Sequence, residues 1–139
     1  MTQLGRWLGV LFLATVASAH AASAAPEPKE IAEAFLAALD KQELESGFGA
    51  LLEHSVFDEA KPQETQLLKT QVKTLFDLYG KSYGYDRVTE KAYGSSLLRF
   101  VYVLRFGNTP VVWNFVFYRV GERWSLLNLT FNNELQGLE

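Results

Sequence analysis

The stretch that decides the fold is SSLLRFVYVLRFGNTPVVWNFVFYRVGERWSLLNLTFNNE, residues 95–134. Val, Phe, Tyr, Trp and Leu dominate it, and residues of this kind favour β-strands. Two short segments rich in turn-forming residues, 107–110 (GNTP) and 121–122 (GE), interrupt the apolar runs. The pattern therefore predicts three long, consecutive antiparallel strands joined by two tight turns.

The turns predict which side chains share a face of this sheet. A two-residue hairpin at 121–122 pairs Phe117 with Leu126 and extends the same register to the far end of both strands. A four-residue loop at 107–110 sets Phe106 opposite Val111. Because side chains alternate along a strand, one face is predicted to carry the large aromatic residues and to end in two polar ones. Its members are Leu98, Phe100, Tyr102, Leu104, Phe106, Trp113, Phe115, Phe117, Trp124, Leu126, Asn128 and Thr130.

A contiguous apolar area of this size is not left in water, so the aromatic face must be covered by other elements. The second face mixes arginines and Asn114 with apolar residues, which indicates partial cover. We interpret its apolar part as a candidate homodimer interface, made of Val101, Val103, Val116, Leu127 and Leu129.

The first 24 residues have the parts of a signal peptide. Arg6 supplies a short positive region, an apolar run follows over residues 7–18, and small residues at 19–24 offer cleavage sites. The apolar run is shorter than the ~20 residues that a membrane-spanning helix needs. We expect cleavage to leave a soluble domain over residues 25–139, exported to a bacterial periplasm or secreted, with no stable membrane anchor.

The composition of the remaining chain limits its partners and chemistry. The sequence has 13 Lys and Arg against 16 Asp and Glu, and it has no cysteine. This mild acidity argues against nucleic acid as a partner. The absence of cysteine means that an apolar core, and not disulfides, must stabilise an exported domain of this length.

Helical periodicity precedes the strands. Residues 29–42 carry apolar side chains at helical spacing, a short second helix ends near His54, and a longer helix covers 61–79. Residues 83–93 are rich in tyrosine and predict a first strand before the three long ones. The predicted fold class is α+β: N-terminal helices packed on one face of a curved, antiparallel, four-stranded sheet.

This order of elements resembles the nuclear transport factor 2-like (NTF2-like) superfamily, with its cystatin-like α+β cone. The resemblance is carried by the helix stripe Ile31, Phe35 and Leu39, by the helix up to Tyr79, and by the closing strands with Arg123-Trp124-Ser125-Leu126. It implies a single domain over residues 25–139, a pocket between the helices and the concave sheet, and, in many members, a dimer formed through the sheet.

The sequence offers few groups for chemistry. After cleavage one histidine, His54, remains and no cysteine, so the usual ligands of zinc, haem and iron–sulfur sites are missing; we expect no metal and no cofactor. No glycine-rich phosphate loop and no nucleophile elbow are present. His54 is either an exposed residue at a helix end or a general base at a pocket mouth.

Some members of the resembled superfamily are isomerases or dehydratases that use an Asp or His base in the cone. By that analogy the candidate catalytic residues are His54 and Asp86, and the candidate ligand-binding residues are Tyr102, Trp113, Phe115, Asn128 and Thr130. Our leading hypothesis is an exported, non-enzymatic domain that holds a small apolar or amphipathic ligand, or a partner protein, at the aromatic face. The alternatives are a small isomerase- or hydrolase-like enzyme and a purely structural homodimer.

Overall fold

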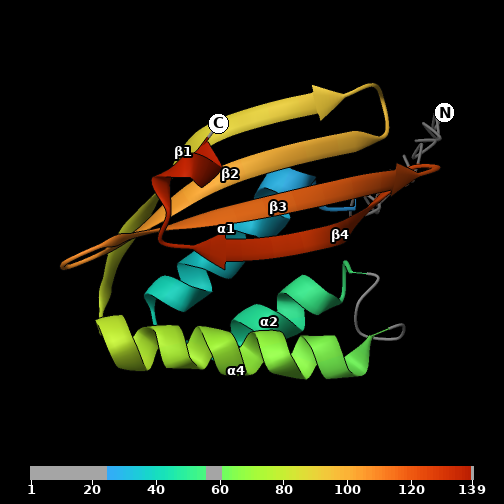
Figure 1. The fold of residues 1–139 in the computed structure, drawn as a ribbon. Helices are drawn as coiled ribbons and strands as arrows, with labels where there is room; N and C mark the ends of the chain where they lie inside the picture. Colours follow the sequence, from blue (N-terminus) through green and yellow to red (C-terminus); the bar gives the residue numbers. More distant parts are fainter. Residues whose placement is uncertain (1–24, 56–60, 139) are drawn as a thin grey trace, which may run out of the picture.

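The computed structural model describes residues 25–55 and 61–138, which form helices followed by strands (Figure 1). In chain order the elements are α1 (Pro28–Asp40), α2 (Leu44–Leu52), α4 (Pro62–Tyr79), β1 (Ser82–Tyr93), β2 (Leu97–Phe106), β3 (Pro110–Val120), β4 (Arg123–Asn132) and the 3₁₀-helix η1 (Leu135–Leu138). The α+β architecture expected from the sequence is confirmed. The predicted signal peptide, residues 1–24, lies outside the described residues. Within the described ranges, no helix has the length and apolar character needed to cross a membrane.

Helix α1 begins and packs as its sequence predicts. Pro28 occupies the first turn, where its missing N–H costs nothing, and the Glu30 side chain accepts a hydrogen bond from the backbone N–H of Glu27 at 3.3 Å. The stripe of Ile31, Phe35 and Leu39 is almost completely buried. The helix therefore presents one apolar face to the sheet.

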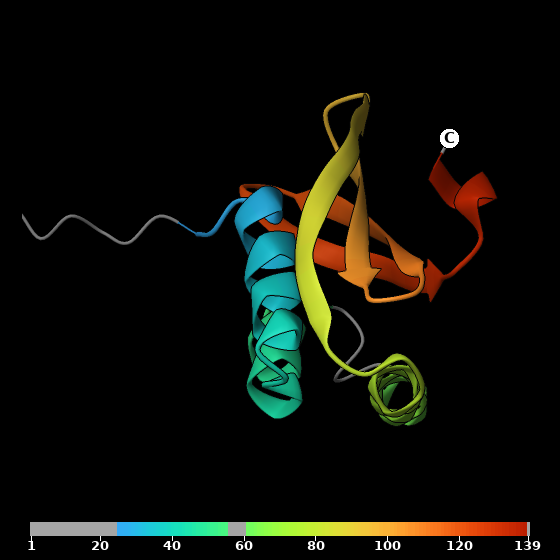
Figure 2. The same cartoon turned by 90° about the vertical axis from the view of Figure 1, so that its left-hand side faces the viewer.

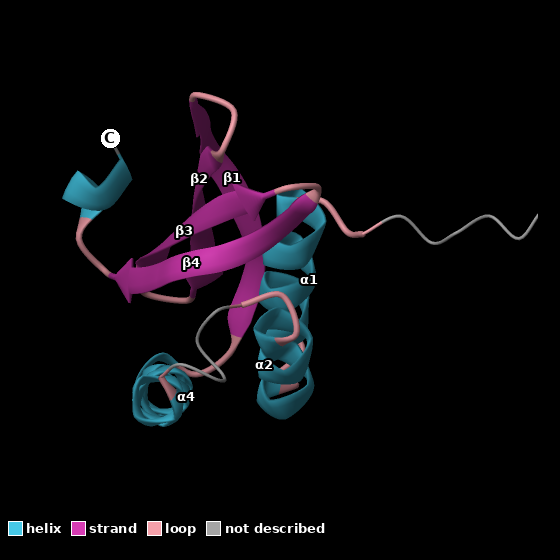
Figure 3. Cartoon of the chain, turned by 90° about the vertical axis from the view of Figure 1, so that its right-hand side faces the viewer, coloured by secondary structure: helices cyan, strands magenta, loops and turns pink. Residues whose placement is uncertain are grey.

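The four strands form one antiparallel sheet in the order β1-β2-β3-β4. Helices α1 and α2 lie on one side of this curved sheet, and η1 lies on the other (Figures 2 and 3). Helix α4 runs below the sheet, beside α2 (Figures 1 and 3). The helix-covered face is the predicted aromatic face, and its centre is fully buried: Phe100, Tyr102, Leu104, Trp113, Phe115 and Phe117.

The register between β2 and β3 differs from the sequence prediction by two residues. Leu104, and not Phe106, lies opposite Val111, and Tyr102 lies opposite Trp113. The difference arises because Pro110, expected in the turn, pairs with Arg105 as part of β3. A shift of two residues leaves every side chain on its predicted face.

The register between β3 and β4 is as predicted at the hairpin and wrong beyond it. Phe117 pairs with Leu126, but Val116 pairs with Asn128, so Leu127 is left unpaired in a β-bulge. The bulge exchanges the two faces for the rest of β4. Leu129 and Phe131 therefore pack on the aromatic side, opposite Phe115 and Trp113. The predicted positions of Asn128 and Thr130 on the aromatic face, and of Leu129 on the second face, are wrong.

The core is organised around the Phe35 ring of α1. Its centroid lies 5.1 Å from that of Phe48, 5.7 Å from that of Trp113 and 6.1 Å from that of Phe115, all in edge-to-face geometry. Trp113 is stacked on Phe131, with ring centroids 4.7 Å apart. These contacts join α1, α2, β3 and β4 in one cluster.

Two glycines of α2 test how closely α1 and α2 pack. A Cβ at Gly47 would lie 3.0 Å from the Cβ of Ala38, whereas a Cβ at Gly49 would meet nothing within 4 Å. We expect Gly47→Ala to lower the free energy of unfolding by about 1–2 kcal/mol, because two packed helices must separate. The matched variant Gly49→Ala should raise it by roughly 0.5–1 kcal/mol through helix propensity. Urea denaturation of both variants measures the difference, and equal effects would contradict this packing.

Candidate functional site

A cavity of about 230 Å³ lies where α2, α4 and β4 meet. Six leucines form most of its wall, and four polar residues complete it. The leucines are Leu51, Leu52, Leu67, Leu68, Leu126 and Leu129, and the polar residues are Glu64, Thr65, Gln71 and Asn128. Apolar walls with a few polar groups are typical of small-molecule sites.

The polar residues of this leucine-lined cavity differ in their availability. The Thr65 hydroxyl donates a hydrogen bond to the Lys61 carbonyl at 3.2 Å, so its proton is already used within α4. The side-chain amides of Gln71 and Asn128 have no hydrogen-bond partner among the described residues, and both residues are exposed. An amide at the rim of an apolar cavity can orient the polar end of a ligand.

The sequence-predicted ligand residues do not come together in one place. Tyr102, Trp113 and Phe115 have no exposed surface, and none of them lines the leucine-lined cavity. Asn128 contributes to the cavity wall, beside Leu129 at the edge of the sheet. Thr130 is exposed on the second face. Helix α1 therefore occupies the concave space in which the ligand was expected.

One polar atom of the aromatic core lacks a partner. The indole Nε1–H of Trp113 is buried, and no acceptor lies within reach of it among the described residues. A buried donor without a partner typically costs about 1–3 kcal/mol. The size of the stacked and edge-to-face contacts of this indole explains why it is nonetheless accommodated.

Helix α1 brings a carboxylate to the aromatic face that the sequence did not reveal. The buried Tyr102 hydroxyl donates a hydrogen bond to Glu33 Oε1 at 3.2 Å. Burial, together with the nearby Glu33 charge, raises the pKa of Tyr102 well above its usual value. Burial likewise raises the pKa of the neighbouring Tyr85. Both phenols are therefore neutral at physiological pH, and the Tyr102 hydroxyl acts as a donor, not as a base.

The two candidate catalytic residues lie at opposite edges of the sheet. His54 is half-buried after α2, where its carbonyl accepts a hydrogen bond from the Leu126 N–H of β4 at 2.6 Å. Asp86 is on β1, exposed, with its carboxylate 3.7 Å from Nε of Arg105. Because β1 and β4 are the two edge strands, these residues cannot form an acid–base pair.

The described residues, 25–55 and 61–138, contain no cluster of three His, Asp or Glu side chains that could hold a metal ion. The two carboxylates that α1 brings close to the sheet, Glu33 and Asp40, instead accept hydrogen bonds. Asp40, at the end of α1, is the clearest case: its Oδ1 accepts hydrogen bonds from the Ser82 hydroxyl at 2.6 Å and from the Gly84 N–H at 2.8 Å. These two hydrogen bonds, which we call the Asp40 cluster, join the end of α1 to the start of β1.

Comparison with known proteins gives one informative result. No family model matches the chain, and no curated protein sequence matches it. Among solved structures, the crystal structure of a "Putative NTF2-like transpeptidase" from Campylobacter jejuni is similar, with a TM-score of 0.54. The match covers 74% of this chain and 99% of that chain at 12% sequence identity. A likeness at this identity describes the fold and not the activity.

The Asp40 cluster predicts a pH dependence of stability. The Ser82 hydrogen bond, helped by the Gly84 N–H and nearby positive charges, holds the pKa of Asp40 below its usual value against the opposing effect of burial. A carboxylate with a lowered folded-state pKa stabilises the fold above its unfolded pKa of about 3.9, and this contribution is lost as the pH falls through the folded-state value. We therefore expect Asp40→Asn to be destabilised at neutral pH and to lose less stability than the unchanged chain between about pH 5 and pH 3.

Urea midpoints measured across this pH range check the expectation. The matched control is Asp77→Asn, an exposed position on α4. Its pH profile should run parallel to that of the unchanged chain. Parallel profiles for Asp40→Asn as well would show that the cluster does not contribute.

Proposed function

Starting from the NTF2-like fold, which the chain shares with its structural neighbour, we propose that it is a ligand-binding domain with no catalytic activity of its own. The observation that supports this function is the leucine-lined cavity between α2, α4 and β4, with the Gln71 and Asn128 amides at its rim. The proposed ligand is small and amphipathic: an apolar part enters the cavity, and a polar end meets the amides.

The energetics favour such a ligand. Each methylene group that leaves water for an apolar wall contributes about 0.8 kcal/mol, so even a short chain gains several kcal/mol before the cost of association. A ligand without a polar end would leave the two rim amides unused, and a ligand that placed a charge among the leucines, and not at the rim, would lose hydration without compensation. The amphipathic class fits both parts of the site.

The proposed place of action is outside the cytoplasm. The signal-like segment 1–24 supports export to a bacterial periplasm or secretion. A chain with no cysteine depends on its apolar core alone in that oxidising compartment.

Catalysis is the weaker alternative. The similar protein carries the word transpeptidase in its name, and an acyl transfer of that type needs an activated nucleophile. The isomerase- or hydrolase-like alternative needs His54 or Asp86 at a cavity. Neither residue belongs to the wall of the leucine-lined cavity, and Asp86 is engaged with Arg105.

Native mass spectrometry on gently purified protein, followed by titration with the fluorescent amphiphile anilinonaphthalene sulfonate, tests the binding function. Leu67 lines the cavity and is 58% exposed, so Leu67→Trp should fill the cavity without disturbing the core. We expect this variant to bind the probe at least tenfold more weakly. Leu78→Trp, at a 70% exposed position of the same helix outside the cavity, is the matched control and should bind normally. Equal affinities for both variants would contradict the site.

A second candidate function is self-association through the second sheet face. Exposed apolar side chains gather there at the end of the sheet where the β1–β2 and β3–β4 turns lie. At this end Tyr93 and Tyr118 both pair with Leu97, and Leu127 bulges from β4 nearby. Of the residues expected at this interface, Val103, Val116 and Leu127 remain accessible, whereas Val101 is fully buried and Leu129 faces the core. The proposed interface is therefore displaced toward Tyr93 and Tyr118.

A charged substitution at the centre of this patch tests the dimer. We expect Tyr118→Glu to shift the chain to the monomer mass in sedimentation experiments, because a desolvated carboxylate would oppose association. Leu78→Glu places the same charge on an exposed apolar position of α4 and should leave the mass unchanged. A monomer before any substitution would exclude this function.

A further inference from the structure

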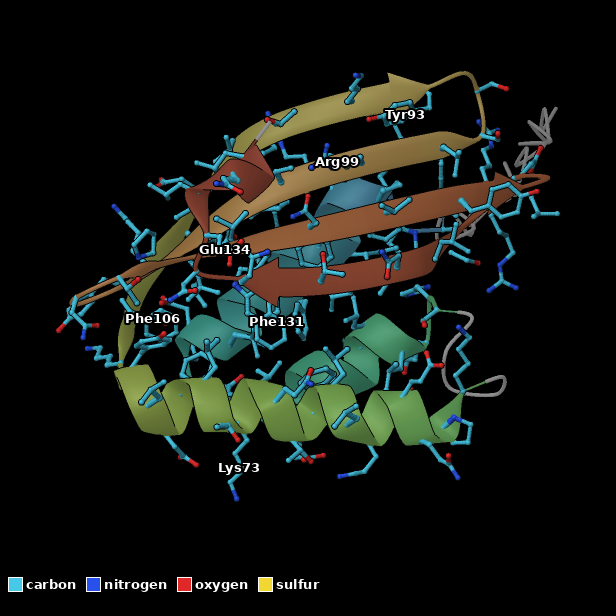
Figure 4. All side chains as sticks on the ribbon, viewed as in Figure 1. Lys73, Tyr93, Arg99, Phe106, Phe131 and Glu134 are labelled. Carbon is cyan, nitrogen blue, oxygen red and sulfur yellow. The ribbon has the colours of Figure 1, made fainter. Side chains whose placement is uncertain are left out.

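A second, larger cleft of about 690 Å³ lies between the start of α2 and the middle of α4. Its α4 wall is formed by residues at helical spacing, Gln66, Lys69, Thr70 and Lys73. The opposite wall is formed by the turn and first residues of α2, Gln42, Glu43, Leu44, Glu45 and Ser46, with Phe48 behind them. Lys73 projects from α4 on the side away from the sheet (Figure 4).

The lining of this cleft is more polar than that of the leucine-lined cavity, because eight of its ten residues have polar side chains. Phe48 is almost completely buried in the core, so a ligand in the cleft would meet Leu44 and the aliphatic parts of the polar side chains, with charged, amide and hydroxyl groups at their ends. The Ser46 and Thr70 hydroxyls donate their protons to main-chain carbonyls of their own segments, at 3.1 and 3.0 Å, and so keep their lone pairs as acceptors. The side-chain amides of Gln42 and Gln66 have no hydrogen-bond partner among the described residues.

The charges of the two walls are opposite in sign. Lys69 and Lys73 follow each other by one turn on α4, and Glu43 and Glu45 lie across from them at the start of α2. One ion pair crosses the cleft, from Lys69 Nζ to Glu45 Oε2 at 3.9 Å, and the Glu45 side chain is 90% exposed. A pair of this length and exposure contributes little and can be replaced by a ligand.

The other two charged side chains of the cleft are available to a ligand. Lys73 and Glu43 form no ion pair within residues 25–55 and 61–138, and both are exposed. The Lys69 side chain is only 29% exposed, so its ammonium is held near the cleft, with less freedom than a lysine on an open surface. Each wall therefore offers a partner for a ligand charge of one sign.

We propose that this cleft binds a zwitterionic ligand of the size of a short peptide with free ends. The ligand carboxylate meets Lys69 and Lys73 on α4, and the ligand ammonium meets Glu43 and Glu45 on α2. A simple anion would face the two glutamates, and a simple cation would face the two lysines, so opposite charges on one molecule fit the lining best. The volume lies within the range of about 300–1,000 Å³ that ligand pockets occupy.

The proposal extends beyond the binding of an amphipathic ligand, because the cleft and the leucine-lined cavity share no lining residue. A ligand in the cleft would perturb residues 42–48 of the α2 wall, which do not line the leucine-lined cavity, whereas Leu67, Leu68 and Gln71 of α4 belong to that cavity. A ligand in the leucine-lined cavity would perturb Leu126, Asn128 and Leu129. The two sites can therefore be tested separately on the same protein.

Trialanine with free ends is a suitable probe, titrated into the ¹⁵N-labelled full chain and followed by amide chemical shifts. We expect shifts to cluster at 42–48 and at Gln66, Lys69, Thr70 and Lys73. We expect N-acetyl-trialanine amide, which lacks both charges, to cause none. Lys69→Gln/Lys73→Gln and Glu43→Gln/Glu45→Gln should each weaken trialanine binding at least tenfold. The matched controls Lys29→Gln on α1 and Glu122→Gln in the β3–β4 turn change exposed charges elsewhere and should bind normally.

Four results would overturn the proposal. The first three are an absence of shifts at millimolar trialanine, shifts of the same size with the capped peptide, and equal binding by the lysine, glutamate and control variants. Shifts confined to the residues of the leucine-lined cavity would overturn it as well, while leaving the proposed amphipathic-ligand site in place.

Discussion

The structure depends on the insertion of Phe35 into the concave aromatic face. This ring contacts Phe48, Trp113 and Phe115 and so joins both N-terminal helices to the middle of the sheet. Protein interiors are packed as densely as organic crystals, which leaves no room for a ligand once such a ring is in place. The space available to a ligand is therefore displaced from the centre of the cone to its edges, beside α4.

The sequence was sufficient to predict the helices and strands, but not the face of the sheet on which every side chain lies. Periodic apolar residues predicted the helices and the four strands to within a few residues of their observed ends. The prediction failed in β4 beyond Leu126, because strict alternation of side chains does not reveal that Leu127 is an extra residue in the strand. The bulge at Leu127 turns Leu129 and Phe131 toward the core and leaves the polar Asn128 and Thr130 outside it. Burying those two side chains without partners would have been costly.

The candidate site could be predicted only in part. The sequence identified Asn128 as unusual, and it does contribute to a cavity wall, but the leucines around it gave no signal. Cavities form where separate elements meet imperfectly, and the position of α4 beside α2 and β4 is not encoded in any local pattern. The same holds for Glu33, whose bond to Tyr102 depends on how α1 is rotated over β2. Local periodicity predicts which face of a helix is buried, but not which partner lies opposite.

Helix α4 lies between two unlike sites because apolar residues on one side of the helix face the sheet and polar residues on another side face α2. Its stripe around Leu68 and Val72 faces the sheet, whereas Gln66, Lys69 and Lys73 face the start of α2. Only Thr65 and Val72 of this helix are fully buried, and Leu67 and Leu78 are largely exposed. An element with so few buried side chains costs less to displace than a strand of the sheet. Both hollows beside α4 therefore lie along exposed parts of this helix, while the aromatic core held by Phe35 stays closed.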